Sequence, residues 1–143
     1  MIFVSLTRLR IRSVRFVPFF LVHAFRSVRQ ARKAPGFVGG AVLNDRNGAF
    51  WTMTAWDSQR SMRQFMSTGA HKRAMPHLLN WCDEASVAHW EQEDSTLPGW
   101  TDAARRMREL GRASKVLSPS PRHAGLAFPD PKTSAGSMIR RAS

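Results

Sequence analysis

The segment AFWTMTAW, residues 49–56, constrains the fold more than any other part of the chain. Its aromatic and β-branched residues are typical of a β-strand. Side chains alternate along a strand, so two sets of residues face opposite ways: Trp51, Met53 and Ala55 on one face, and Phe50, Thr52, Thr54 and Trp56 on the other. Because both faces carry aromatic rings, we expect this strand to be covered on both sides.

A hairpin partner precedes this strand. FVGGAVLN, residues 37–44, has the pattern of a strand, and DRNG, residues 45–48, contains the Asn-Gly pair that favours a tight hairpin turn. Gly39 and Gly40 weaken the first strand and indicate a β-bulge or the close approach of another group.

The other predicted elements flank this hairpin. Before the hairpin we expect a strand over 2–11 and a helix that starts after Ser13, has Pro18 in its first turn and stops at 34–37. After the hairpin we expect a helix from Asp57 or Ser58 to Gly69 and a helical piece over about 70–82 that is broken or kinked at Pro76. A strand over 84–92 follows. This order predicts an α+β fold of the ferredoxin-like βαββαβ type, with an antiparallel sheet and helices on one face.

The composition changes after this region. We expect a domain over 1–93, an appended amphipathic helix within 94–111, and a disordered basic tail over 112–143, where Ser, Pro, Gly and Arg dominate.

The net charge of +12 does not by itself indicate a nucleic-acid site. Residues 1–33 hold eight basic and no acidic residues, whereas residues 34–92 are neutral. The excess is therefore split between one N-terminal segment and the tail, which is typical of a solvated basic surface. We expect no specific nucleic-acid partner.

Two further classes are disfavoured. The apolar run 16–25 is too short to span a bilayer and contains Pro18 and His23, so we expect no transmembrane segment. The single Cys82 and five scattered histidines form no metal-ligand spacing, so no metal site is predicted. A lone cysteine also favours a reducing compartment, and hence a cytoplasmic location.

Three stretches resemble a known superfamily: APGFVGGAV (34–42), FWTMTAWDSQRSMRQFMSTGAHKRAMP (50–76) and WCDEASVAHW (81–90). With the element order, they make residues 1–92 similar to the dimeric α+β barrel superfamily, in particular to antibiotic biosynthesis monooxygenases and spheroidene monooxygenase-like domains. The resemblance implies a homodimer whose sheets pack face to face, and a pocket between each sheet and its helices.

The resemblance also bears on cofactors. Haem-degrading members use an Asn on the first strand, a Trp near the end of the third strand and a His on the second helix. Trp56 and His71 match the latter two positions, but residues 2–11 contain no Asn. No cofactor is predicted, and haem is the less favoured ligand.

The predicted site combines residues on the third strand and the helix that follows it. His71 is the candidate catalytic base, because a neutral histidine with an ordinary pKa near 6.5 suits proton transfer. Candidate substrate-binding residues are Trp56, Trp51, Thr52, Thr54 and His89. For each of them an ordinary role in core packing is the alternative. Since Trp51 and Trp56 face opposite ways, we expect Trp56 to share a pocket with His71 and Trp51 to serve in packing.

Two functions remain open. One is a monooxygenase, an oxidoreductase that acts on an apolar small molecule without a cofactor, in which His71 removes a proton and the substrate itself reduces dioxygen. The other is a non-catalytic dimeric module that binds an apolar small molecule, or haem, in the same pocket.

Overall fold

The computed structural model of the chain describes residues 1–45, 48–131 and 136–140, without the side chains of residues 70, 71, 74, 136 and 137. Part of the predicted turn, residues 46–47, lies outside this range. The elements are β1 (Ile2–Ile11), the short 3-10 helix η1 (Val14–Phe16), α1 (Val17–Lys33), β2 (Phe37–Asn44), β3 (Ala49–Trp56), α2 (Gln59–Met66), α3 (Gly69–Trp81), β4 (Cys82–Gln92), α4 (Trp100–Leu110), β5 (Arg112–Ala113) and β6 (Gly136–Ile139).

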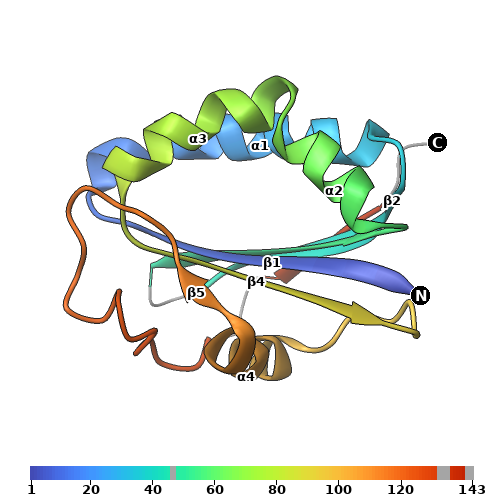
Figure 1. Cartoon of the computed structure of the whole chain (residues 1–143). Helices are drawn as coiled ribbons and strands as arrows, with labels where there is room; N and C mark the ends of the chain where they lie inside the picture. Colours follow the sequence, from blue (N-terminus) through green and yellow to red (C-terminus); the bar gives the residue numbers. More distant parts are fainter. Residues whose placement is uncertain (46–47, 132–135, 141–143) are drawn as a thin grey trace.

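The strands form one antiparallel sheet in the order β5-β4-β1-β3-β2-β6. Helices α1, α2 and α3 lie over one face of this sheet, and α4 lies against the other (Figure 1). The predicted α+β, ferredoxin-like arrangement is therefore confirmed for β1 to β4 and their helices.

Local signals in the sequence explain where the helices begin. Pro18 stands in the first turn of α1, where its missing N–H removes no helical hydrogen bond. Ser58 caps α2, since its Oγ accepts a hydrogen bond of 3.2 Å from the backbone N–H of Ser61. The break expected at Pro76 does not occur, because α3 runs through this residue. Pro76 is exposed, so water can solvate the carbonyl group that lacks its helical partner.

The two glycines of β2 have the predicted role. The register of β2 against β3 shifts between Phe37 and Gly39, as at a β-bulge. A Cβ atom on Gly40 would collide with the carbonyl oxygen of Met53 on the neighbouring strand. Only glycine allows this close approach of the two backbones.

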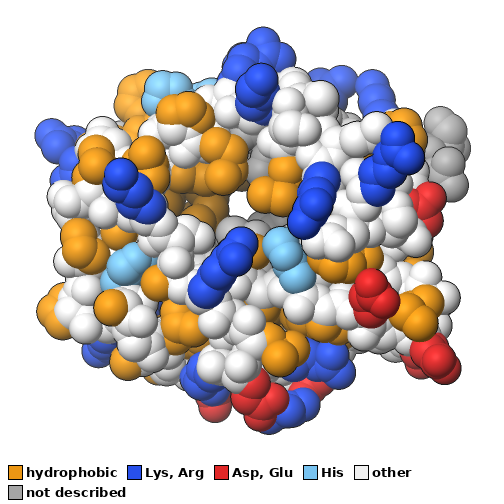
Figure 2. Space-filling view, viewed as in Figure 1, with side chains coloured by type: hydrophobic (Ala, Val, Ile, Leu, Met, Phe, Trp, Pro, Cys, Tyr) orange, Lys and Arg blue, Asp and Glu red, His pale blue; other side chains and the backbone are white. Residues whose placement is uncertain are grey.

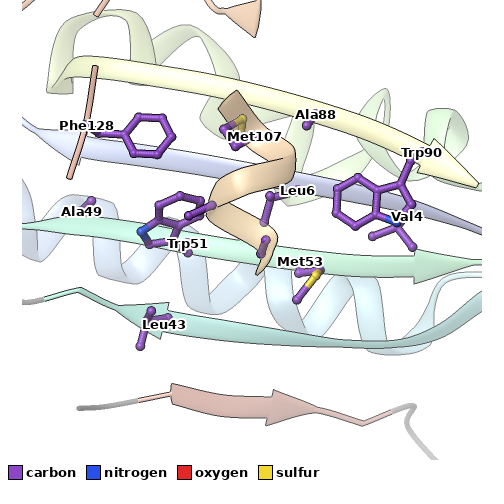
Figure 3. Close-up of a cluster of buried hydrophobic side chains, with 12 residues drawn as sticks. Val4, Leu6, Leu43, Ala49, Trp51, Met53, Ala88, Trp90, Met107 and Phe128 are labelled. Atoms are coloured by element: carbon purple, nitrogen blue, oxygen red, sulfur yellow. The ribbon is translucent and has the colours of Figure 1, made fainter. Parts of the chain in front are cut away.

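The sheet face that meets α4 holds a dense core. Trp51 is fully buried there, with its ring centroid 5.4 Å from that of Phe128 and 6.4 Å from that of Trp100. Met107 of α4 lies over the same face (Figure 3). The resemblance implied that the sheet of a second copy covers one sheet face, whereas α4 and Phe128 cover the Trp51 face within one chain. The homodimer itself stays a prediction.

Within the segment 112–143, where the composition predicts a disordered tail, the described residues include two short strands. β5 pairs with β4, β6 pairs with β2, and Phe128 and Ile139 are buried. The Ser120 hydroxyl donates a 2.8 Å hydrogen bond to Glu84, which also forms a buried 2.7 Å ion pair with Arg8. Few apolar residues suffice here, because they insert into surfaces that the rest of the chain has already formed.

In the described ranges, no helix is long and apolar enough to cross a bilayer.

Candidate functional site

The two faces of the sheet are packed to different degrees. On the α4 side, Leu6, Trp51 and Ala88 are buried. On the helix side of the same strands, Thr7, Thr52 and Val87 are only half-buried. Central strands beneath helices are normally buried, so this half-exposure shows a hollow between the sheet and the helices.

The helices leave this hollow because they bury few side chains against the middle of the sheet. Among the described side chains, α1 buries only Phe20 and Ala31, and α3 buries only Trp81 at its end. By contrast, α2 buries Met62 and Phe65, which pack beside Trp56 at the far end of β3.

The hollow opens as a groove of about 630 Å³ at the β4 edge of the sheet. Figure 2 shows it in the centre of this face, with hydrophobic side chains in its walls and basic and histidine side chains at its rim. The groove is lined by Gln59, Met62, Arg63, Met66 and Ser67 of α2, Val87 and His89 of β4, Leu110 of α4 and Arg112 of β5. Its volume lies within the usual range for small-molecule pockets, about 300–1,000 Å³.

Polar side chains form rows across the sheet on the helix side. Ser5 of β1 lies directly between His89 of β4 and Thr54 of β3. Thr7 lies in the same way between Val87 and Thr52. Because residues opposite each other on antiparallel strands share a face, four hydroxyl groups and one imidazole ring point toward the helices.

On this surface, the surroundings of His89 shift the pKa of its imidazole ring from the ordinary value. Its ring lies 5.3 Å from that of Phe3, and its Nε2 atom is buried without a hydrogen-bond partner among the described residues. Burial lowers the pKa of His89, and the positive charges of Arg112 and Arg63 lower it further. A lowered pKa favours the neutral ring at pH 7, the form in which one ring nitrogen can accept a proton.

Trp56 and Thr54 share the helix side with His89, at the closed end of the hollow. Trp56 is fully buried, 5.3 Å from Phe37 and 5.1 Å from Phe65 between ring centroids. Its indole N–H donates a 2.9 Å hydrogen bond to Thr54 Oγ1. Thr52 lies one row nearer the middle of the sheet. Neither Trp56 nor the threonines line the groove itself.

Trp51 lies on the other face, as the alternation predicted. It belongs to the core beneath α4, whereas Trp56 belongs to the core beneath α1 and α2. His71 lies in the first turn of α3, and its side chain is outside the described part of the structure. The structure thus brings Trp56, Thr52, Thr54 and His89 to one face, and the site role of each of them and of His71 stays a prediction.

Several lining residues had no functional signal in the sequence. Met62 and Met66 read only as the apolar face of α2, and Arg63 as a solvated charge beside it. Leu110 and Arg112 lie beyond the predicted domain, and only the pairing of β5 with β4 brings them to the groove. No local sequence pattern predicts a strand of only two residues.

Other reactive groups are remote or inert. Burial, reinforced by Asp83, raises the pKa of Cys82 to about 12, so its thiol stays protonated at neutral pH. Among the described residues, no three histidine, cysteine, aspartate or glutamate side chains are grouped to hold a metal ion.

Comparison with known proteins gives one family and a common fold. The family model described as "Domain of unknown function (DUF3291)" matches residues 20–117. The curated proteins contain no significant match. Rv0793 from Mycobacterium tuberculosis is 8% identical, with a TM-score of 0.60 over 68% of this chain and 100% of that one.

Two further structures carry functional names. SnoaB, a cofactor-independent oxygenase from Streptomyces nogalater, is 15% identical with a TM-score of 0.55, over 68% of this chain and 98% of that one. An antibiotic biosynthesis monooxygenase is also 15% identical, with a TM-score of 0.57 over 66% of this chain and 100% of that one. At these identities the likeness shows the fold alone, and it confirms the resemblance to the dimeric α+β barrel superfamily.

Proposed function

The chain belongs to the DUF3291 family, a family of this fold, and on that premise we propose that it is a monooxygenase-like protein that binds an apolar small molecule in the groove beside α2. The observation that carries the proposal is the groove itself, which has room for a small molecule and is lined by His89, a histidine whose buried Nε2 atom has no partner among the described residues. SnoaB, an oxygenase of the same fold that needs no cofactor, supports the choice of chemistry.

The walls of the groove favour an apolar body. Met62, Met66 and Val87 line it, and the flexible thioethers of methionine adapt to ligands of irregular shape. The Thr54 hydroxyl accepts a hydrogen bond from Trp56, which fixes its position on the helix side of the sheet. Thr54 and Thr52 lie beyond the lining of the groove, so they remain candidate contacts for a ligand that reaches further into the hollow.

The proposed reaction begins with proton removal. Neutral His89 accepts a proton on Nε2 from an acidic C–H bond of the substrate, and the electron pair stays on that carbon. The carbanion then reduces dioxygen. For a CH₂ group flanked by aromatic rings, one oxygen atom becomes the new carbonyl oxygen and the other leaves as water with the two hydrogens. A general base of this kind contributes about 100- to 10,000-fold to the rate. His71, the base predicted from the sequence, is the second candidate for this role.

Anthrone tests this chemistry, because it is a three-ring ketone with such an acidic CH₂ group. We expect the chain to consume oxygen with anthrone, and His89→Ala to lower the rate at least about 100-fold. His71→Ala, measured in parallel, separates the two candidate bases. If both variants consume oxygen as fast as the unchanged chain, neither histidine is the base.

A non-catalytic binding module is the alternative, and one observation favours it. Among the nine residues that line the groove, His89 alone can exchange a proton near neutral pH. Binding of anthrone by calorimetry without oxygen consumption would support this alternative. A mass spectrum and a visible absorption spectrum of the freshly purified protein would identify any ligand that copurifies, haem included.

The proposal retains the homodimer and the cytoplasmic location. Since α4 covers the sheet face within the chain, a dimer would use another apolar surface. On η1 and α1, five large apolar side chains are exposed: Val14, Phe19, Leu21, Val22 and Phe25. The free thiol of Cys82 remains the reason for a reducing compartment.

A further inference from the structure

The charged side chains that line the groove are all positive. Its lining includes Arg63, Arg112 and the imidazole of His89 but no aspartate or glutamate. The two arginines come from separate elements, α2 and β5, and meet at one cavity. A positive, partly apolar cavity attracts a ligand that is apolar in its body and negatively charged at one end.

The two arginines of the groove are not neutralised by carboxylates of the described residues. Arg8, Arg10 and Arg108 form ion pairs of 2.6–2.8 Å with carboxylates of the chain. Within the described part of the chain, Arg63 and Arg112 form no such pair. Their charges are therefore available to a ligand.

The sheet register directs Arg112 toward the groove. Arg112 lies opposite Val87, which lines the groove, so both side chains leave the sheet on the helix side. Arg63 follows Met62 on α2 and lies on the opposite wall. The electrostatic effect of both arginines reaches His89, because each lowers the pKa of that ring. All three residues line the same groove.

We propose that the groove binds an apolar carboxylate, with its anionic end between Arg63 and Arg112 and its apolar body against Met62, Met66 and Val87. The proposal rests on the groove being the small-molecule site proposed above, and it names the class of molecule. The simpler interpretation is that both arginines are solvated charges at the rim of a site for neutral ligands.

Two probes of one shape decide between these interpretations. 2-Naphthoate carries a carboxylate on a two-ring apolar body, and 2-naphthamide replaces the charge with a neutral amide. We expect calorimetry of the full-length chain at low salt to show 2-naphthoate binding roughly tenfold or more tightly than 2-naphthamide. Added salt should narrow the difference, because it screens the arginines.

Substitution of the two arginines tests whether they cause the preference for 2-naphthoate over 2-naphthamide. Arg63→Gln combined with Arg112→Gln should lower the affinity for 2-naphthoate to about that for 2-naphthamide and so remove the preference. Arg60→Gln is the matched control, since Arg60 is exposed on the same helix, carries the same charge and does not line the groove. Circular dichroism should show that all variants remain folded.

The outcomes separate the two proposals. Equal affinity for both probes, or an equal loss with Arg60→Gln, would overturn the carboxylate assignment and leave a site for neutral apolar molecules. Binding of neither probe by the unchanged chain would overturn the small-molecule site itself, and the carboxylate assignment with it.

Discussion

Gly36 fixes the entry of the chain into β2. Its φ angle is +84°, in the region that favours glycine, and its carbonyl oxygen accepts a 2.8 Å hydrogen bond from the N–H of Asp57. A Cβ atom at this position would collide with Ser61 and Asp57, whose side chains form a 2.6 Å hydrogen bond with each other. The residue thus joins the start of β2 to the start of α2.

We predict that Gly36→Ala destabilises the chain by more than the roughly 1–2 kcal/mol that a left-handed conformation alone costs a residue with a Cβ atom. Gly48→Ala is the matched control, because its φ angle is +82° but no atom of the described residues lies within 4 Å of the added methyl group. Urea denaturation measures both. Equal losses would mean that the contact with Ser61 and Asp57 does not matter.

His89 links the groove to the pH dependence of stability. Its pKa is lower in the folded chain than the ordinary value of 6.5, through burial and then through Arg112 and Arg63. The neighbouring β1 residues, Phe3 and Ser5, bring no charge. Between the two pKa values the unfolded chain therefore binds a proton that the folded chain does not.

We predict that the free energy of unfolding falls as the pH is lowered from 7.5 through 6.5 toward the lower pKa of His89. Above pH 7.5 this histidine makes no difference. His89→Gln should make the free energy of unfolding fall less steeply as the pH is lowered. Part of the fall should remain, because His23 also has a pKa lowered by burial. Urea denaturation between pH 7.5 and 5.5 checks this, and an unchanged slope in the variant would show that His89 is freely solvated.

At the scale of elements, α4 is held to the sheet largely through Trp51. Ala103, Ala104 and Met107 of α4 are all buried in the core that contains this ring. The small alanines allow the helix to approach the sheet closely, and Phe128 closes the end of the cluster edge-on to Trp51.

We predict that Trp51→Ala costs about 3–5 kcal/mol of stability, as large truncations in a packed core do. Thr52→Ala should cost about 1 kcal/mol or less, because this neighbour faces the hollow on the other side of the same strand. Thermal and urea denaturation give both values. Comparable costs would mean that the two faces are packed equally well.

The core elements could be predicted from the sequence because their signals are local. Alternation placed Trp51 and Trp56 on opposite faces of β3, and the paired glycines of β2 predicted the irregular register. What covers the Trp51 face was not predictable. The amphipathic pattern of 101–111 shows that the apolar face of this helix must be buried, but it does not show which surface buries it. A second chain and the chain's own α4 satisfy that pattern equally.

The site was predictable only where it rests on strands. The register that brings His89, Ser5 and Thr54 into one row follows from alternation and pairing. Arg112 depends on β5, whose two residues have no strand preference of their own and pair because β4 offers a free edge. The sequence therefore did not predict the positive charge of the groove, because the position of Arg112 depends on tertiary structure.

At the scale of the whole molecule, the residues after β4 complete both faces of the sheet. α4 and Phe128 cover one face, and Leu110 and Arg112 wall the groove on the other. β6 pairs along β2 and places Ile139 in the core that contains Trp56. The family model ends at residue 117, so it includes the wall of the groove and not β6.

A chain truncated after residue 113 keeps α4 and Arg112 but loses Phe128 and β6. Truncation should lower the melting temperature on the order of 10 °C or more, because burying a phenylalanine contributes roughly 3–5 kcal/mol. It should also raise the mass measured by light scattering above that of the full-length chain. The open edge of β2 then offers a surface to a second copy.

Two full-length variants separate the causes. Phe128→Ser should reproduce much of the loss in melting temperature without the increase in mass, because β6 still protects β2. Met138→Ser should change neither, since this side chain is 69% exposed. If the truncated chain instead melts and scatters like the full-length chain, residues 114–143 do not pack on the sheet, and the disorder expected from their composition describes them correctly.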